Sequence, residues 1–136
     1  MRTSLIALLV ALVGSCASPH EGTTAPTTIA GTWHVEGQDA SSWKAQLVLD
    51  EAPDRSVANS GHFDWKSDEG YSGHELVTWS YDPDTRMVVL VGQEMQDPVG
   101  LVGVGTYVAK VSEDGRSMEN GTWGPPAMPG TWEARR

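Results

Sequence analysis

From residue 29 onward, apolar and polar side chains alternate along the chain with a period of two. Every second residue between Trp43 and Leu49 is apolar, and the same alternation places Phe63 and Trp65 on one face of a later segment. A period of two is typical of a β-strand with one buried face, and no segment in this region shows a convincing helical period. The pattern therefore predicts an all-β domain.

Turn signals divide this region into eight predicted strands. Residues 82–85 ("DPDT") and 112–116 ("SEDGR") are examples of such turns. The predicted strands cover about 29–35, 43–49, 62–66, 74–81, 86–93, 100–111, 117–123 and 130–136. Eight short strands in simple sequence order favour an eight-stranded antiparallel up-and-down barrel. The interior of such a barrel is filled by side chains or holds one small ligand.

The tripeptide Gly-Thr-Trp occurs three times, at residues 31–33, 121–123 and 130–132, and Gly105-Thr106-Tyr107 is a near copy. Glycine and tryptophan two residues apart on a strand share a face, so we expect each indole to lie over the space beside its own glycine. A β-branched threonine suits the opposite, exposed face. The repeats predict barrel closure by Gly31, Trp33, Trp123 and Trp132.

These residues resemble the calycin superfamily, which includes lipocalins, fatty-acid-binding proteins and avidins. The first strand of those proteins begins with Gly-x-Trp, as at Gly31-Thr32-Trp33, and an arginine near the last strand packs across the tryptophan. The resemblance implies this role for Arg135 or Arg136. Strand parity favours Arg136, which shares a face with Trp132, and a guanidinium over an indole is a cation–π contact.

The middle of the chain, residues 70–95, is similar to secreted bacterial lipocalin-like domains of unknown function, in which a Tyr-Asp turn follows an aromatic strand. The opening "GTWHVEG" is also similar to the haem-binding nitrobindins. Their proximal histidine lies near the C-terminus, whereas this chain has no histidine after His74. The haem role is therefore not transferred, and no cofactor is expected.

The N-terminus is typical of an export signal. Arg2 precedes an apolar stretch that is short for a membrane span, and small residues lead to Cys16, the one cysteine in the chain. This order resembles the bacterial lipobox, in which the cysteine is lipidated, and an ordinary signal peptide is the alternative. We expect a signal peptide at 1–15, a lipidated Cys16 with a flexible linker at 16–28, and the barrel domain at 29–136. The predicted location is the bacterial cell envelope, at the outer membrane or cell surface.

The formal net charge of the chain is −9, and its acidic residues are spread along the sequence. Nucleic-acid binding requires a basic patch, so no nucleic-acid partner is expected. Dispersed negative charge is typical of a soluble exported domain.

Candidate chemistry in the sequence is sparse. His62 and Asp64, and His74 and Glu75 after the acidic loop at 67–70 ("SDEG"), offer nitrogen and oxygen ligands for zinc. No cysteine ligand or tight His-x₃-His repeat accompanies them, so no metal site is expected. The carboxylates of Glu36, Asp39, Glu75 and Glu94 are interpreted as a solvated surface. Without an oriented nucleophile and base, the sequence predicts no catalytic residues and no enzyme activity.

The chain has six tryptophans and one phenylalanine. We expect a group of aromatic residues without an assigned role in closure to line a cavity for an apolar ligand: Trp43, Phe63, Trp65, Trp79 and Tyr107. The leading hypothesis is a lipid-anchored barrel that binds a small apolar molecule. The alternative is a filled barrel that serves as an envelope scaffold, an inhibitor or a module for binding another envelope protein.

Overall fold

The computed structural model of the protein describes residues 24–97 and 103–136. The predicted signal peptide, Cys16 and most of the predicted linker lie outside these residues. In the described part of the chain, no helix is long and apolar enough to cross a membrane.

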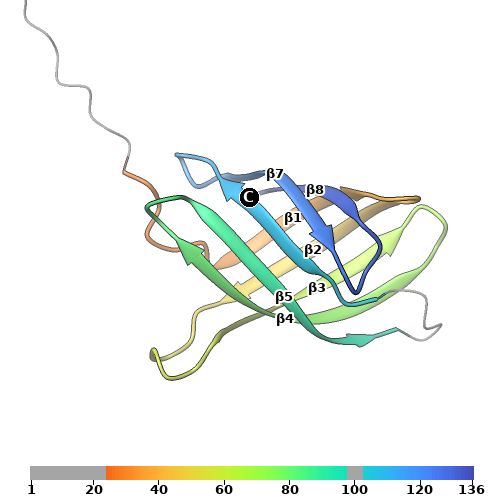
Figure 1. The fold of residues 1–136 in the computed structure, drawn as a ribbon, viewed down its shortest axis with the longest axis horizontal. Coiled ribbons are helices and arrows are strands. Elements are labelled where there is room, and N and C mark those ends of the chain that lie inside the picture. The colour runs from red at the N-terminus through yellow and green to blue at the C-terminus, as the bar shows by residue number, and fades with distance from the viewer. Residues whose placement is uncertain (1–23, 98–102) are drawn as a thin grey trace, which may run out of the picture.

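The described residues form a closed antiparallel β-barrel in which the strands follow one another in sequence order (Figure 1). The strands are β1 (Gly31–Gln38), β2 (Ser42–Asp50), β3 (Asn59–Ser67), β4 (Ser72–Asp82), β5 (Met87–Gln96), β6 (Thr106–Val111), β7 (Ser117–Gly124) and β8 (Gly130–Arg135). The barrel closes because β8 pairs with β1 as well as with β7. The predicted all-β, eight-stranded up-and-down barrel is confirmed.

One predicted strand is longer than the strand that forms. The sequence predicted a strand over 100–111, but β6 begins at Thr106, and residues 103–105 have no strand structure. The Gly105 N–H donates to the carboxylate of Glu75 at 2.9 Å instead of to a neighbouring strand. A side-chain acceptor therefore replaces the backbone acceptor on the N–H side of Gly105, whereas its carbonyl oxygen still accepts from the Gly92 N–H of β5 at 2.8 Å.

The two ends of the barrel differ. The turns β1–β2 and β3–β4 and the loop β7–β8 lie at one end, on the right of Figure 1, which is called the mouth from here on. The turns β4–β5 and β6–β7 lie at the opposite, closed end. Small and medium-sized aliphatic side chains fill the interior at the closed end, among them Leu49, Val88, Val111 and Met118.

Arg136 completes the closed end. Its guanidinium carbon lies 4.4 Å from the ring centroid of Trp33, which is fully buried. Arg136 Nε also donates to the carbonyl oxygen of Gly115 at 2.8 Å, and its Nη1 donates to that of Ala30 at 3.0 Å. Arg135, the other arginine that the resemblance implied, is exposed on the outer face. The cation–π contact therefore belongs to Arg136.

The two C-terminal Gly-Thr-Trp repeats pack reciprocally. In the register of β7 and β8, Gly121 lies opposite Trp132, and Trp123 lies opposite Gly130. A Cβ atom on Gly130 would lie 2.6 Å from Trp123 Nε1, and one on Gly121 would lie 2.7 Å from Trp132 Nε1. Each indole covers the glycine of the other repeat, so the expectation that it covers its own glycine is wrong here.

The other two glycines of these motifs behave differently from each other. Gly105 does make room for the aromatic residue of its own motif, because a Cβ there would lie 3.0 Å from the Tyr107 hydroxyl. Gly31 is exposed and has a φ of 125°, a conformation that favours glycine. At the start of β1 the glycine is therefore required by the backbone and not by an indole.

Candidate functional site

The mouth of the barrel holds a cavity of about 310 Å³. This volume is at the lower limit of the range of about 300–1,000 Å³ that is typical of small-molecule sites. Its walls come from the turns β1–β2 and β3–β4, the segment just before β6, the loop β7–β8 and the inward faces of several strands: Asp39, Ala40, Ser41, Trp43, Trp65, Glu69, Tyr71, Gly103, Tyr107, Trp123, Ala127 and Met128.

Four aromatic side chains form the inner wall of this cavity. Trp65 is the central one: its ring centroid lies 6.3 Å from that of Trp43, 6.1 Å from that of Tyr107 and 5.8 Å from that of Trp123. Trp43 and Trp123 both meet Trp65 edge to face, whereas Tyr107 is stacked nearly parallel to it. A flat apolar molecule that enters the mouth therefore meets ring faces and ring edges.

The structure brings three of the five predicted ligand-lining residues to this cavity, namely Trp43, Trp65 and Tyr107. Phe63 lies one layer deeper, fully buried, with its ring 4.7 Å from the rings of both Trp65 and Tyr107. Trp79 does not line the cavity, and its Nε1 donates to the carbonyl oxygens of two residues near the closed end.

Trp123 was assigned to barrel closure from the sequence, and it also lines the cavity. Its ring packs over Gly130, and a Cβ on Gly37 would clash with the same ring. The two glycines thus let the indole pack closely against β1 and β8 while it also borders the cavity. Trp132 also has glycine neighbours on both sides, Gly121 and Gly37, and it does not line the cavity.

A buried carboxylate lies behind the aromatic wall. Glu75 is completely shielded from solvent, and both of its carboxylate oxygens accept hydrogen bonds. Its Oε2 accepts from Trp65 Nε1 at 3.0 Å and from the Tyr107 hydroxyl at 2.7 Å, while its Oε1 accepts from the Gly105 N–H at 2.9 Å. Glu75 therefore fixes the orientation of two of the four rings in the cavity wall.

Burial perturbs the protonation of this group. Desolvation raises the pKa of Glu75, and the hydrogen bonds from Tyr107, Gly105 and Trp65 offset part of that increase. The pKa of Tyr107 is strongly raised, first by its own desolvation and then by the charge of Glu75. The tyrosine thus keeps its proton throughout the neutral range and acts as a hydrogen-bond donor.

The interpretation of Glu75 as a solvated surface group is wrong. Its position on the strand contained the correct signal, because Glu75, Val77 and Trp79 are two residues apart and share the inward face of β4. The sequence could not show the compensating donors, since Trp65 and Tyr107 come from other strands.

The rim of the cavity is acidic. Asp39 Oδ1 accepts a hydrogen bond from Trp43 Nε1 at 2.9 Å and another from the Ser41 N–H at 2.8 Å. The Ser41 hydroxyl donates to Glu69 Oε2 at 3.0 Å, which links the β1–β2 turn to the β3–β4 turn. The mouth therefore combines an aromatic wall with two carboxylates at its entrance.

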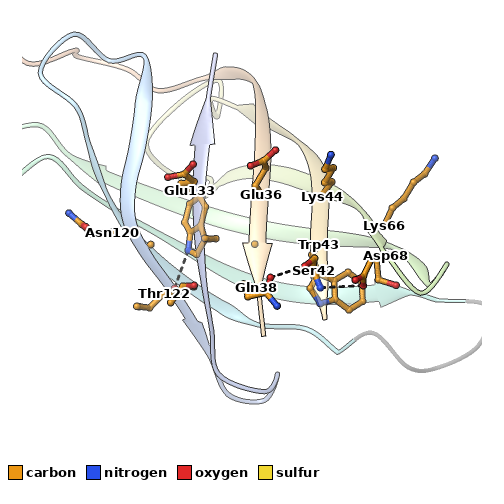
Figure 2. A pocket seen from close by; sticks show the side chains of 15 residues that line it. Glu36, Gln38, Ser42, Trp43, Lys44, Lys66, Asp68, Asn120, Thr122 and Glu133 are labelled. Atoms are coloured by element: carbon orange, nitrogen blue, oxygen red, sulfur yellow. Dashed lines mark hydrogen bonds between the residues drawn. The ribbon is translucent and has the colours of Figure 1, made fainter. Parts of the chain in front are cut away.

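A larger hollow, about 1070 Å³, lies on the outside of the barrel over β1, β2, β3, β7 and β8. Figure 2 shows the side chains of Glu133, Glu36 and Lys44 standing side by side on neighbouring strands, with Lys66 extending away from them. These charged groups are exposed and do not converge on a common point. The cavity at the mouth is the better candidate site, because apolar rings and fixed polar groups meet there.

Fold and site together define a small closed β-barrel with an aromatic cavity at one end, an arrangement consistent with a calycin-like fold. Comparisons of the chain with protein-family models, curated proteins and solved structures found no match in any of the three sets.

Proposed function

We propose that this protein binds a small, planar, apolar molecule in the mouth of its barrel. The observation that supports the proposal is the aromatic wall, in which Trp43, Trp65, Tyr107 and Trp123 border a cavity of about 310 Å³. A filled interior would bring side chains from opposite walls into contact along the whole barrel. Among the described residues, the closed end is filled by core side chains, and the cavity at the mouth lies beside the rings.

The rim restricts the chemistry of the ligand. Asp39 and Glu69 place two carboxylates at the entrance, and the chain as a whole has a formal charge of −9. An anionic molecule such as a free fatty acid would be repelled there, whereas a neutral or cationic molecule would not. The ligand class is therefore a flat apolar compound without a negative charge, with a hydrogen-bond donor or an amine at its exposed end.

The test is a fluorescence titration of the purified full chain with a neutral naphthylamine dye. Binding in the mouth should be saturable, and it should quench tryptophan emission because the dye contacts Trp43. The Trp43→Ala variant should bind at least about ten-fold more weakly, which corresponds to about 1.4 kcal/mol. Trp43 is suited to this test because it is only half-buried, so its removal spares most of the core.

The matched control is Trp79→Phe, which alters an indole that does not line the cavity. Its dye affinity should equal that of the wild-type chain. A folded wild-type protein that does not bind the dye, or a Trp43→Ala variant with unchanged affinity, would refute the ligand proposal. Either result would favour the alternative in which the barrel binds another protein of the envelope.

We also propose that Cys16 anchors the barrel to a membrane through attached lipid. The support is the sequence around it: an apolar segment followed by small residues and the chain's single cysteine. Several acyl chains on one residue would bind firmly, since each buried methylene contributes about 0.8 kcal/mol.

The anchor is tested by metabolic labelling with palmitate in a bacterial host. The wild-type chain should incorporate label and partition with membranes, and Cys16→Ser should abolish both properties. Label that persists in the Cys16→Ser chain would disprove lipidation at this residue. The dye titration does not depend on this result.

A further inference from the structure

On the outside of the barrel, we infer that His62, Asp64 and His74 form a binding site for a divalent transition-metal ion such as Zn²⁺. The three residues lie on the outer faces of β3 and β4, each at least partly exposed. This site is separate from the cavity at the mouth, and the inference does not rest on the proposed ligand function.

The geometry brings both imidazoles to one carboxylate. His74 Nδ1 lies 2.6 Å from Asp64 Oδ1, and His62 Nε2 lies 3.5 Å from Asp64 Oδ2. The two imidazole rings face each other with centroids 4.8 Å apart and an interplanar angle of 35°. One potential ligand atom from each residue lies within 4.8 Å of the other two.

These separations are close to those that a zinc ion requires. Zinc bonds to imidazole nitrogen and carboxylate oxygen are about 2.0–2.2 Å long, so tetrahedral ligand atoms lie about 3.3–3.6 Å apart. Small rotations of the side chains would bring the three groups to these distances. Because the side chains are partly exposed, such rotations do not disturb the core.

The backbone holds the three residues in place. Asp64 and His74 are directly paired in the antiparallel register of β3 and β4, and His62 lies two residues from Asp64 on the same outer face. The barrel keeps both strands in fixed register, because β3 also pairs with β2 and β4 with β5. The ligands are therefore arranged by strand pairing before any ion arrives, which lowers the entropic cost of binding.

The donor set selects the class of ion. Two imidazole nitrogens and one carboxylate oxygen suit zinc, copper or nickel, whereas magnesium and calcium prefer oxygen ligands alone. Three protein ligands leave at least one coordination position facing solvent, where water or a group from another molecule can bind. The carboxylate also offsets part of the ion's positive charge.

The experiment is a calorimetric titration of the full chain carrying Cys16→Ser, so that the thiol cannot bind metal. With ZnCl₂ we expect one ion per chain in the micromolar range, and no binding of MgCl₂ under the same conditions. The double variant His62→Ala/His74→Ala and the near-isosteric Asp64→Asn should each weaken zinc binding by at least about ten-fold, because even residues outside the metal's ligand shell typically contribute 10- to 100-fold. The matched control is His34→Ala, which removes an exposed histidine from β1 and should leave zinc affinity unchanged.

A second readout locates the ion directly. In nitrogen-15 NMR spectra, zinc should shift the ring nitrogens of His62 and His74 and leave those of His34 in place. The proposal is overturned if the folded chain binds no zinc. It is also overturned if His62→Ala/His74→Ala binds zinc as tightly as its parent, or if His34 shifts as much as the other two. In each of these cases the three side chains form only a hydrogen-bonded surface cluster.

Discussion

Glu75 is a sensitive point at which to test the structure, because it is a buried carboxylate with three donors. We consider the replacement Glu75→Gln, which preserves the shape of the side chain. The carboxylate uses Oε2 to accept from Trp65 and Tyr107, and Oε1 to accept from Gly105. Glutamine offers one oxygen, so at least one of these donors faces an NH₂ group instead of an acceptor.

The expected cost follows from this count. If the amide oxygen keeps the Trp65 and Tyr107 bonds, the Gly105 N–H loses its acceptor in a buried position. An unsatisfied buried donor costs about 1–3 kcal/mol. Under acidic conditions both side chains are uncharged, but the hydroxyl oxygen of the protonated carboxyl still has a lone pair for the Gly105 N–H, which the amide nitrogen of glutamine lacks. Glu75→Gln should therefore lower the free energy of unfolding by about that amount at acidic pH.

The difference in free energy of unfolding between the wild-type chain and Glu75→Gln should also depend on pH. Because burial raises the pKa of Glu75 in the folded state, the native protein holds this proton more tightly than the unfolded chain does. Wild-type stability therefore falls as pH rises from the ordinary glutamate value, near 4.5, through the raised value. Glutamine does not titrate, so the wild-type advantage over Glu75→Gln should be greatest at acidic pH and should shrink as pH rises.

Urea denaturation followed by tryptophan fluorescence, from about pH 4 to pH 8, measures the stability difference at acidic pH and its change with pH. The matched control is Glu36→Gln, an exposed glutamate on β1, for which the difference should be close to zero at every pH. A stability difference for Glu75→Gln that stays constant with pH, or that grows as pH rises, would refute the reasoning about a buried carboxyl with a raised pKa.

Three other substitutions test the packing. Arg136→Ala should lower the free energy of unfolding by about 1–3 kcal/mol, because the cation–π contact and the hydrogen bonds of Arg136 are lost. Replacement of the exposed Arg135 by alanine should change it by less than about 0.5 kcal/mol. Equal urea midpoints for the two variants would contradict this prediction. Gly130→Ala should lower the free energy of unfolding by about 1–3 kcal/mol, because the added Cβ meets an indole. At Gly124 an added Cβ meets nothing within 4 Å, so Gly124→Ala should be tolerated. Thermal melts of the two variants test this prediction, and equal midpoints would contradict it. Trp65→Ala should cost about 3–5 kcal/mol, because the side chain is 4% exposed, and an unchanged urea midpoint would show that it is not part of the core.

The sequence was sufficient for the architecture, because the required signals are local. Period-two alternation assigns each side chain to one face of its strand, and short turns allow only neighbouring strands to pair. The alternation alone therefore places Phe63 and Trp65 inside and favours Arg136 over Arg135. The prediction was wrong for 103–105, where alternation continues but the Gly105 N–H bonds to a side chain.

The site depended on relations between strands, which alternation does not encode. Trp123 and Trp132 cover glycines of each other's strands because the β7–β8 register pairs them. The same kind of register brings His74 beside Asp64 on the outer face.

The sequence by itself determined which side chains face inward along the regular strands, because there the choice depends on parity. Parity fails in β7, where the register shifts between Met118 and Gly121 and both residues are buried although they are three positions apart. Only the tertiary structure decided what those side chains meet. Glu75 became a fully hydrogen-bonded buried group because residues 65, 105 and 107 converge on it from distant parts of the chain. The cavity lies at the mouth beside four aromatic rings, whereas aliphatic side chains, together with Trp33 and Trp79, fill the interior toward the closed end. Both outcomes depend on barrel closure and strand register, which are set by all eight strands together.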